Sequence, residues 1–501
     1  MKELSASQVR EHSSRSSCWI VIHGTVYDVT DFIPEHPVKY PIFISKDGIN
    51  QNEEYDPIHP PGTIETYLPT EKHLGRVKPS ELSLLKIPKR VFKSNILNDR
   101  DPETDPDPPA LSTCLSLYDF ESIAKGRLSD QAWAYYSSGS DDEISMRENR
   151  LAFQRLWFRP RVLRDVKHID YSTVLLGQRT SFPVYITATA LGKLGHPDGE
   201  KNLTWAAGSE DMIQMVPTLA SCSFEELVSE RREGQTQWLQ LYVNSDRSRT
   251  ESIVRKAESS GIKALFITVD APQLGRREKD MRLKFETLGS DVQGNESGID
   301  KSQGAARAIS SFIDPSLSWK DIEWFKSITK MPIILKGVQT WEDAVLAREH
   351  GLDGVVLSNH GGRQLDYARS GIEVLVEVVD QLKRRKLWDP DRFEVFVDGG
   401  VRRSVDVLKA LCLGAKAVGI GRPFLYAYSV YGHLGVIRAI QILKDELEMD
   451  MRLIGARNLN ELRPDMIDLS NLKNRVTGLL TDHKFQENYE SLPLIKGKPK
   501  L

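Results

Sequence analysis

Eight short runs of apolar residues follow one another between residues 183 and 423, and helix-length amphipathic stretches separate them. The runs read PVYITATA, MIQMVP, QWLQLY, ALFITVD, PIILKGV, GVVLSNH, EVFVDGG and AVGIGRP. They are almost continuously apolar, as strands of a parallel sheet must be when both faces are buried. Eight strand–helix units in roughly 250 residues predict an α/β fold, a TIM (β/α)8 barrel, with its functional residues at the carboxyl ends of the strands.

Polar residues and glycines stand at these strand ends and predict a binding site. They are Thr189, Tyr242, Thr268, Asp270, Lys336, Ser358, His360, Asp398, Gly399, Gly400, Gly421 and Arg422. The glycines of DGGVRR and GIGRP let backbone N–H groups approach an anion, and the arginines add positive charge. Taken alone, either motif is better explained by tight strand-to-helix turns. Because both follow the last two strands, where barrels often bind phosphate, we predict a phosphate-bearing cofactor.

His360 is the candidate general base. A lone histidine is usually a core residue, but this one stands at a strand end with Arg363 three residues later and Asp270 two strands earlier. A carboxylate would hold the imidazole, and arginine would bind an anionic substrate beside it. Taken alone, Asp270 is explained equally well as a strand-end cap, and Arg277 equally well as a surface charge. Lys336 ends an apolar run, so its ammonium needs an anionic partner.

Length and composition allow at least two domains and exclude several classes of partner. The 501 residues include 67 Lys and Arg against 70 Asp and Glu, a net charge of −3, which favours neither nucleic acid nor an anionic membrane. The 4 cysteines are widely spaced, which argues against disulfides and a zinc site. We find no apolar run that would span a bilayer and no evident targeting segment, so we expect the cytosol. The ending Pro499, Lys500 and Leu501 only loosely matches the peroxisomal signal.

Composition changes along the chain indicate the domain boundaries. Residues 17 to 33, SCWIVIHGTVYDVTDFI, predict two short strands around a His-Gly turn. We assign residues 1–80 to a first small domain, 81–109 to a linker rich in proline and acids, 110–475 to the barrel and 476–501 to a polar tail. The stretch from Glu286 to Arg307 has no apolar period and is too long for an ordinary connection, so we expect a lid or a disordered loop.

The motifs SNHGGRQLD, TVDAPQLGRRE, DGGVRR and IGRP, in this order, resemble the FMN-dependent 2-hydroxy-acid dehydrogenase and oxidase family. The segments AWAYYSSGSDDE, ATALGKLGHPDGE, QLYV and LKGV extend the match over most of residues 115 to 475. The resemblance implies FMN at the mouth of a TIM barrel. It places the cofactor contacts on Ala188, Thr189, Ala190, Gln240, Thr268, Lys336, Ser358, Asp398, Gly399, Gly400, Val401, Arg402, Gly421 and Arg422.

The same resemblance implies roles around the substrate. Tyr135, Arg277 and Arg363 would bind its carboxylate, Tyr242 would meet its hydroxyl, and His360 would be the base that Asp270 orients. Whether hydrogen leaves the substrate carbon as a proton or a hydride is left open. The small Ala190 and Leu219 are compatible with lactate. Pro217 departs from the serine that is usual in the family and removes a hydroxyl and an N–H from the flavin site.

The amino-terminal unit resembles cytochrome b5, through CWIVIHGTVYDVTDFIPEHP and the later YDPIHPPGTIETYL. The resemblance implies a b-type haem bound by His36 and His59, which lie 23 residues apart, the spacing expected of that family. In that family the first haem ligand normally lies in the sequence His-Pro-Gly-Gly, whereas His36 is followed by PVKYP. Without those glycines the local backbone is more restricted. The alternative is two surface histidines in a domain that has lost its haem.

The whole chain resembles the flavocytochrome b2 type of L-lactate dehydrogenase. The expected function is therefore oxidation of an L-2-hydroxy acid, L-lactate first, at FMN, with electrons passed through haem to a cytochrome c-like acceptor. The alternatives are a haem-less FMN oxidase that gives hydrogen peroxide and a non-catalytic haem- or flavin-binding protein. Members of the family are often tetramers, and the polar tail could wrap a neighbouring subunit. Flavocytochromes of this type commonly reach the mitochondrial intermembrane space.

Overall fold

The computed structural model describes residues 2–14, 17–32, 64, 68–81, 108–283 and 312–475. The chain forms two compact units, and the change from one to the other falls between Leu115 and Ser116. The predicted loop at 286–307, the predicted tail and all but the ends of the predicted linker lie outside the described residues. The domain boundaries drawn from the sequence stay predictions.

In its described residues, the amino-terminal unit contains a small sheet with helix α1 (Ala6–Glu11) packed against it. Its strand order is β1 (Glu3–Leu4), β5 (His73–Val77), β4 (Thr25–Asp28), β3 (Ser17–Ile22) and β2 (Ser13–Ser14). Strands β3 and β4 pair antiparallel, and His23 and Gly24 between them both have positive φ, 50° and 77°. The predicted hairpin around the His-Gly turn is therefore confirmed.

Alternation along β3 gives this sheet two apolar faces. Cys18, Ile20 and Ile22 belong to one buried cluster, which includes Tyr27, and Val21 belongs to a second cluster with Val9 of α1. Side chains two residues apart on a strand point the same way, so one short sequence supplies both clusters. Both faces of this sheet are thus built for burial.

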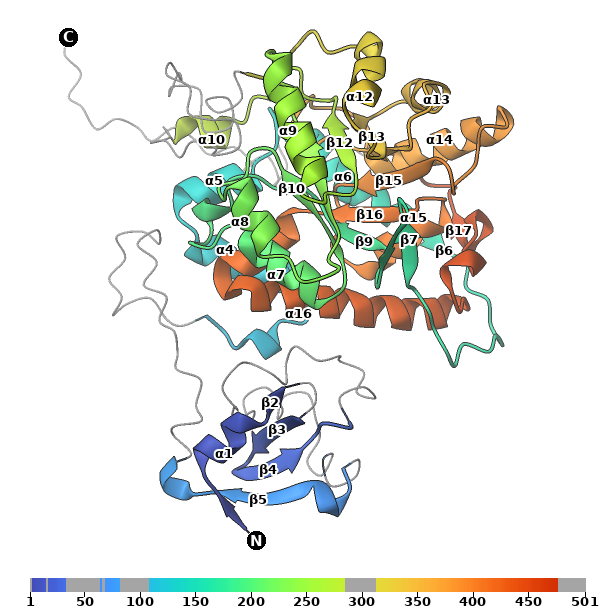
Figure 1. The fold of residues 1–501 in the computed structure, drawn as a ribbon. Coiled ribbons are helices and arrows are strands. Elements are labelled where there is room, and N and C mark those ends of the chain that lie inside the picture. The colour runs from blue at the N-terminus through green and yellow to red at the C-terminus, as the bar shows by residue number, and fades with distance from the viewer. Residues whose placement is uncertain are drawn as a thin grey trace, which may run out of the picture. The chain divides into compact units, whose positions relative to one another are not determined.

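The second unit is a closed barrel of eight parallel strands (Figure 1). In chain order they are β9 (Val184–Ile186), β10 (Ile213–Pro217), β11 (Gln237–Leu241), β12 (Leu265–Thr268), β13 (Ile333–Val338), β14 (Gly354–Leu357), β15 (Glu394–Asp398) and β16 (Ala417–Ile420). Strand β16 pairs with β9 and closes the ring. Each of the eight predicted runs contains one of these strands, so the predicted TIM barrel is confirmed.

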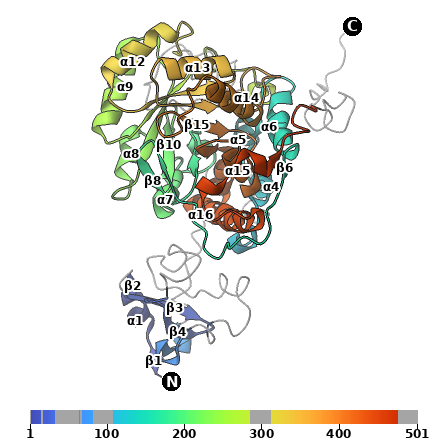
Figure 2. The ribbon, with the colours of Figure 1, turned by 90° about the vertical axis from the view of Figure 1, so that its right-hand side faces the viewer.

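Helices follow the strands and lie outside the ring in both views (Figures 1 and 2). They are α7 (Lys201–Ser209), α8 (Phe224–Ser229), α9 (Arg247–Ser259), α12 (Ile322–Ile328), α13 (Trp341–Glu349), α14 (Gly371–Arg384), α15 (Ser404–Cys412) and α16 (Arg422–Ile454). Helix α16 packs on α7 and on α4 (Leu117–Arg127), which precedes the barrel with α5 (Asp130–Ser137) and α6 (Ile144–Gln154). Among the described helices, none combines the length and the apolarity needed to cross a bilayer.

Large aromatic side chains fill the interior of the barrel. Trp238 stacks on Phe266 with ring centroids 4.8 Å apart, and Tyr185 meets Phe396 edge-on at 5.8 Å. All four side chains are fully buried. The interior is therefore a packed core, and ligands are restricted to the mouth at the carboxyl ends of the strands.

Candidate active site

A cavity opens at the carboxyl ends of the barrel strands and contains about 1090 Å³ of space between protein atoms, part of it open to solvent. Nearly all residues predicted for the site line it. They are Tyr135, Ala188, Thr189, Ala190, Gln240, Tyr242, Thr268, Arg277, Lys336, His360, Arg363, Asp398, Gly399, Gly400, Val401, Arg402, Gly421 and Arg422, together with Pro217 and Leu219. The strand ends thus meet at one place, as the barrel topology requires.

His360 lies between a carboxylate and a phenol. Its Nδ1 is 3.0 Å from Asp270 Oδ1, and its Nε2 is 3.1 Å from the Tyr242 hydroxyl. The Asp270 side chain is completely buried and follows β12, and Tyr242 follows β11. A carboxylate on Nδ1 leaves Nε2 free to exchange a proton with a ligand at the tyrosine.

The backbone at His360 is strained, and the site holds it in place. Its φ is 61°, in the left-handed region that side chains other than glycine rarely adopt. The backbone N–H of His360 donates to Ser358 Oγ at 3.0 Å. Burial lowers the pKa of His360, and the charge and hydrogen bond of Asp270 oppose that shift. The imidazole is therefore neutral, and able to accept a proton, at pH 7.

Two arginines and a tyrosine line the same cavity. Arg277 is 3% exposed, and burial together with the charge of Arg363 lowers its pKa to about 10. Arg363 donates to the backbone oxygens of Tyr135, Tyr136 and Ser138 at 2.7, 3.3 and 3.1 Å. Both guanidinium carbons lie within 6.0 Å of the centre of the Tyr135 ring. Two like charges held this close favour an anionic ligand, and a carboxylate matches the geometry of a guanidinium.

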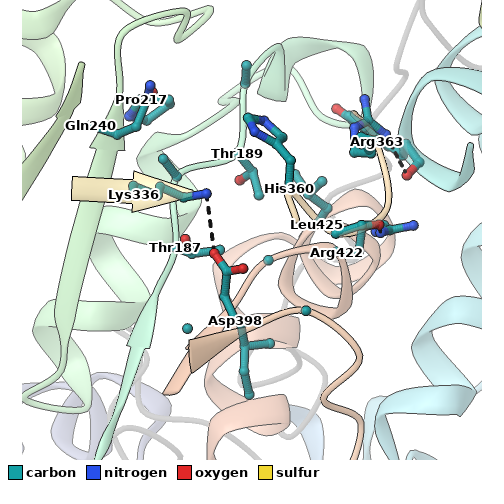
Figure 3. Close-up of a pocket in the computed structure, with 18 of the residues that line it drawn as sticks. Thr187, Thr189, Pro217, Gln240, Lys336, His360, Arg363, Asp398, Arg422 and Leu425 are labelled. Atoms are coloured by element: carbon teal, nitrogen blue, oxygen red, sulfur yellow. Dashed lines mark hydrogen bonds and ion pairs between the residues drawn. The ribbon is translucent and has the colours of Figure 1, made fainter. Parts of the chain in front are cut away.

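Lys336 and Asp398 form an ion pair in the lining of the cavity, with Nζ 3.3 Å from Oδ2 (Figure 3). The Lys336 Nζ also lies 3.5 Å from Ser358 Oγ. Burial acts to lower the pKa of Lys336, but the charges of Asp398 and Asp270 outweigh it and raise that pKa. Lys336 is therefore a fixed positive charge, and the sequence prediction of an anionic partner for it is confirmed.

The mouth of the barrel between β15 and α16 can bind an anion. Gly399 and Gly400 have φ of 90° and 83°, and a Cβ on Gly400 would lie 2.0 Å from the backbone oxygen of Asn149. Glycine is therefore required at residue 400. Arg402 donates to Glu121, and its pKa is raised because the Glu121 charge outweighs burial. Arg422 begins α16, where the helix dipole adds positive potential.

Unpaired buried polar atoms show that these residues fit a polar cofactor. Thr187 Oγ1, Thr189 Oγ1 and Asp398 Oδ1 are buried with no hydrogen-bond partner among the described residues. All three residues line the cavity, and leaving such groups unpaired is costly. Figure 3 shows Pro217, Gln240 and Lys336 on the left, Thr189, His360 and Asp398 in the middle, and Arg363 and Arg422 on the right. FMN, with a polar ring system and a phosphate, matches this set of donors, acceptors and charges.

Two predicted residues do not line the cavity, and several lining residues were not predicted. Asp270 contacts the Nδ1 atom of His360 and does not reach the cavity. The Ser358 hydroxyl accepts a hydrogen bond from the backbone of His360. The predicted role of Ser358 in cofactor binding stays a prediction. The lining residues not predicted are Tyr136, Thr187, Leu274, Gly361, Gly419, Ile420, Pro423 and Leu425. Thr187 could have been predicted from the sequence. It precedes Thr189 by two residues in the same predicted strand, so the two side chains lie on the same face.

The predicted haem ligands His36 and His59 lie outside the described residues, as does the sequence PVKYP after His36. Their role stays a prediction. The described residues of the amino-terminal unit do supply the two-faced sheet given above.

Comparison with known proteins agrees with this architecture. Residues 124–469 match the family described as FMN-dependent dehydrogenase. Residues 5–78 match the family described as cytochrome b5-like haem/steroid binding domain.

Two relatives match almost the whole length of this chain. The L-lactate dehydrogenase (cytochrome) of Wickerhamomyces anomalus is 54% identical, over 99% of this chain and 85% of the relative. The protein of the same description from Saccharomyces cerevisiae is 49% identical, over 98% and 83%. The solved flavin-binding domain of baker's yeast flavocytochrome b2 superimposes with a TM-score of 0.68 and 52% identity, over 78% of this chain and 96% of that domain. This chain therefore belongs to the FMN-dependent dehydrogenase family, in the flavocytochrome b2 arrangement that joins a cytochrome b5-like haem domain to the barrel.

Proposed function

We propose that this chain oxidises L-lactate to pyruvate, with FMN in the barrel and a b-type haem held by His36 and His59, and that a cytochrome c-like protein accepts the electrons. One observation carries the proposal most strongly. His360, bonded to Asp270, shares one cavity with Arg277 and Arg363, so a candidate base and two groups suited to binding a carboxylate face the same cavity. A small 2-hydroxy acid has the carboxylate and the hydroxyl that this arrangement would bind.

The two arginines and Tyr135 would fix the substrate carboxylate. Arg363 donates to three backbone oxygens, and Arg277 is buried. Both side chains are therefore already ordered before a ligand binds. Such preorganisation reduces the entropy lost on binding. The carboxylate would also relieve the repulsion between the two guanidinium groups.

The Tyr242 hydroxyl and His360 Nε2 would face the reacting end of the substrate. They are 3.1 Å apart, so one ligand hydroxyl can meet both. His360 Nε2 would accept the proton that leaves the substrate, and Asp270 would stabilise the imidazolium through Nδ1. Burial raises the pKa of Tyr242, as does the nearby charge of Asp270, so its hydroxyl stays protonated and donates a hydrogen bond.

FMN, when bound, supplies the acceptor for the two electrons released as the hydroxyl carbon becomes a carbonyl. The residues proposed to hold it are those that line the cavity on the side of Lys336, Gln240 and Thr268, and those at the anion site of Gly399, Gly400, Arg402 and Arg422. Lys336 would place a positive charge beside the flavin. We propose Ala190 and Leu219 for the space around the substrate methyl group.

The pH dependence of the reaction follows from the neutral state of His360. Only neutral imidazole accepts a proton, and burial lowers the pKa of His360 below its ordinary value of 6.5. We expect kcat/KM for L-lactate to be constant from neutral pH upward and to fall as the pH drops through that lowered pKa. The measurement is kcat/KM against pH. An acid limb with its midpoint above the ordinary histidine value would contradict this account of His360.

Haem binding and acceptor choice are tested together on the purified full-length chain. We expect a haem Soret band that shifts on reduction by L-lactate, and lactate-dependent reduction of cytochrome c. His36→Ala or His59→Ala should remove the Soret band and cytochrome c reduction while leaving FMN bound. His23→Asn is the matched control, because His23 is exposed in a turn at φ 50°, which asparagine tolerates. Lactate-dependent peroxide formation without a Soret band would instead indicate a haem-less oxidase.

We also propose the cytosol as the compartment, as the sequence composition suggested, with the mitochondrial intermembrane space and the peroxisome as alternatives. A homotetramer is the assembly that the family resemblance suggests. Cell fractionation and analytical ultracentrifugation test these two proposals.

A further inference from the structure

Strand β13 is irregular at Gly337. Against β14, Lys336 pairs with Val356 and Val338 pairs with Leu357, so Gly337 is an extra residue in the ladder. Its φ is 109°, a conformation that residues with a side chain rarely adopt. A bulge of this kind bends the strand and changes the direction of neighbouring side chains, and it is common beside active sites.

The bulge lies directly against Asp270. A Cβ on Gly337 would lie 2.4 Å from Asp270 Cγ, 2.6 Å from its Cβ and 2.8 Å from Oδ1. Oδ1 is the atom that contacts His360 Nδ1 at 3.0 Å. The Asp270 side chain is fully buried, so it has no solvent to move into. A side chain at 337 would therefore displace the carboxylate from His360.

The residues on either side of Gly337 hold the other members of the site. Lys336 pairs with Asp398 in the cavity, and its backbone oxygen accepts from the Val269 N–H at 2.9 Å, next to Asp270. The backbone oxygen of Val338 accepts from the Ser358 N–H at 3.2 Å, two residues before His360. The bulge thus connects the segments that carry the base, its carboxylate and the lysine.

We propose that Gly337 is a positioning residue for the pair formed by His360 and Asp270. Because Gly337 has no side chain, the Asp270 carboxylate has room to contact His360 Nδ1. This rests on the proposed function of His360 as the base. Gly337 itself does not line the cavity and need not touch a ligand.

A side chain at residue 337 should shift the acid limb of the pH profile in one direction, and a simple loss of packing would not produce such a shift. The groups that face His360 are Asp270, Tyr242, Lys336 and Arg277, from four different segments. Asp270 raises the pKa of His360, while burial, Lys336 and Arg277 lower it. Displacing Asp270 should therefore move the acid limb of the pH profile to lower pH and also slow the reaction, because the imidazolium loses its partner.

The test compares Gly337→Ala with Gly177→Ala and Gly234→Ala. The two control glycines also have positive φ, 76° and 77°, but an added Cβ meets no atom within 4 Å at either. The controls therefore report the cost of a side chain at a positive φ that makes no close contact. In Gly337→Ala we expect FMN content, read from absorbance, to match the wild type, flavin reduction by L-lactate to fall by ~100-fold, and the acid limb to shift downward. Both controls should reduce flavin within about twofold of the wild type.

A reduction rate within about twofold of the wild type and an unshifted acid limb in Gly337→Ala would overturn the inference. If Gly337→Ala fails to bind FMN, the double variant Gly337→Ala with Asp270→Gly tests whether contact with Asp270 is the cause. Asp270→Gly removes all three atoms that an alanine Cβ at 337 would meet. Recovered FMN binding would support the contact with Asp270, and continued loss would overturn it. Absence of lactate-dependent reduction in the wild type would instead refute the proposed function.

Discussion

Replacing His360 with glutamine is expected to leave FMN bound and to slow flavin reduction by L-lactate by ~10⁴-fold. Glutamine is similar in size to histidine and can still bond to Asp270 and Tyr242, but it cannot accept a proton at neutral pH. The loss should appear in the rate of reduction, measured by rapid mixing under anaerobic conditions, and not in the flavin absorbance of the resting protein.

His168→Gln is the matched control, because His168 is exposed and does not line the cavity. It should behave as the wild type. If His360→Gln reduced its flavin at the wild-type rate, His360 could not be the base. If it lost FMN altogether, His360 would be needed for binding rather than for proton transfer.

Replacing Arg277 with leucine should lower kcat/KM for L-lactate by ~100-fold, the loss of about 3 kcal/mol that follows removal of one partner from a buried charge pair. Arg277 is buried and lines the cavity, and its substrate partner would be a carboxylate. The effect should fall on substrate affinity as well as on rate.

The adjacent Arg276 gives a closely matched control. Its side chain is 59% exposed and pairs with Glu278 at 3.4 Å, and it does not line the cavity. Arg276→Leu should change kcat/KM by less than about twofold, since exposed ion pairs contribute little. Equal effects of the two substitutions would show that general positive charge matters, rather than a specific contact with the carboxylate.

Much of the barrel was predictable because burial imposes a strong pattern on parallel strands. Strands buried on both faces must be apolar, and the polar residues at the end of each apolar run mark the edge where ligands bind. His360, Lys336 and Asp398 were found in this way, and they line one cavity. Their roles came from the family motifs, since the pattern alone does not distinguish a base from a turn residue.

Other parts of the site depend on contacts between distant segments, which no local pattern encodes. Tyr136 lies on α5 and Leu425 on α16, and both reach the cavity only because these helices pack beside the barrel mouth. The bulge at Gly337 is likewise set by pairing with β14 and by its contact with Asp270. In the sequence, Gly337 is one glycine in a strand-like run.

The most direct test of the account is anaerobic mixing of L-lactate with the purified full-length protein, followed by flavin and haem absorbance. The account predicts that the flavin band bleaches first and that the haem band of the reduced state then appears. A flavin band that stays oxidised with L-lactate and with other small 2-hydroxy acids would contradict it.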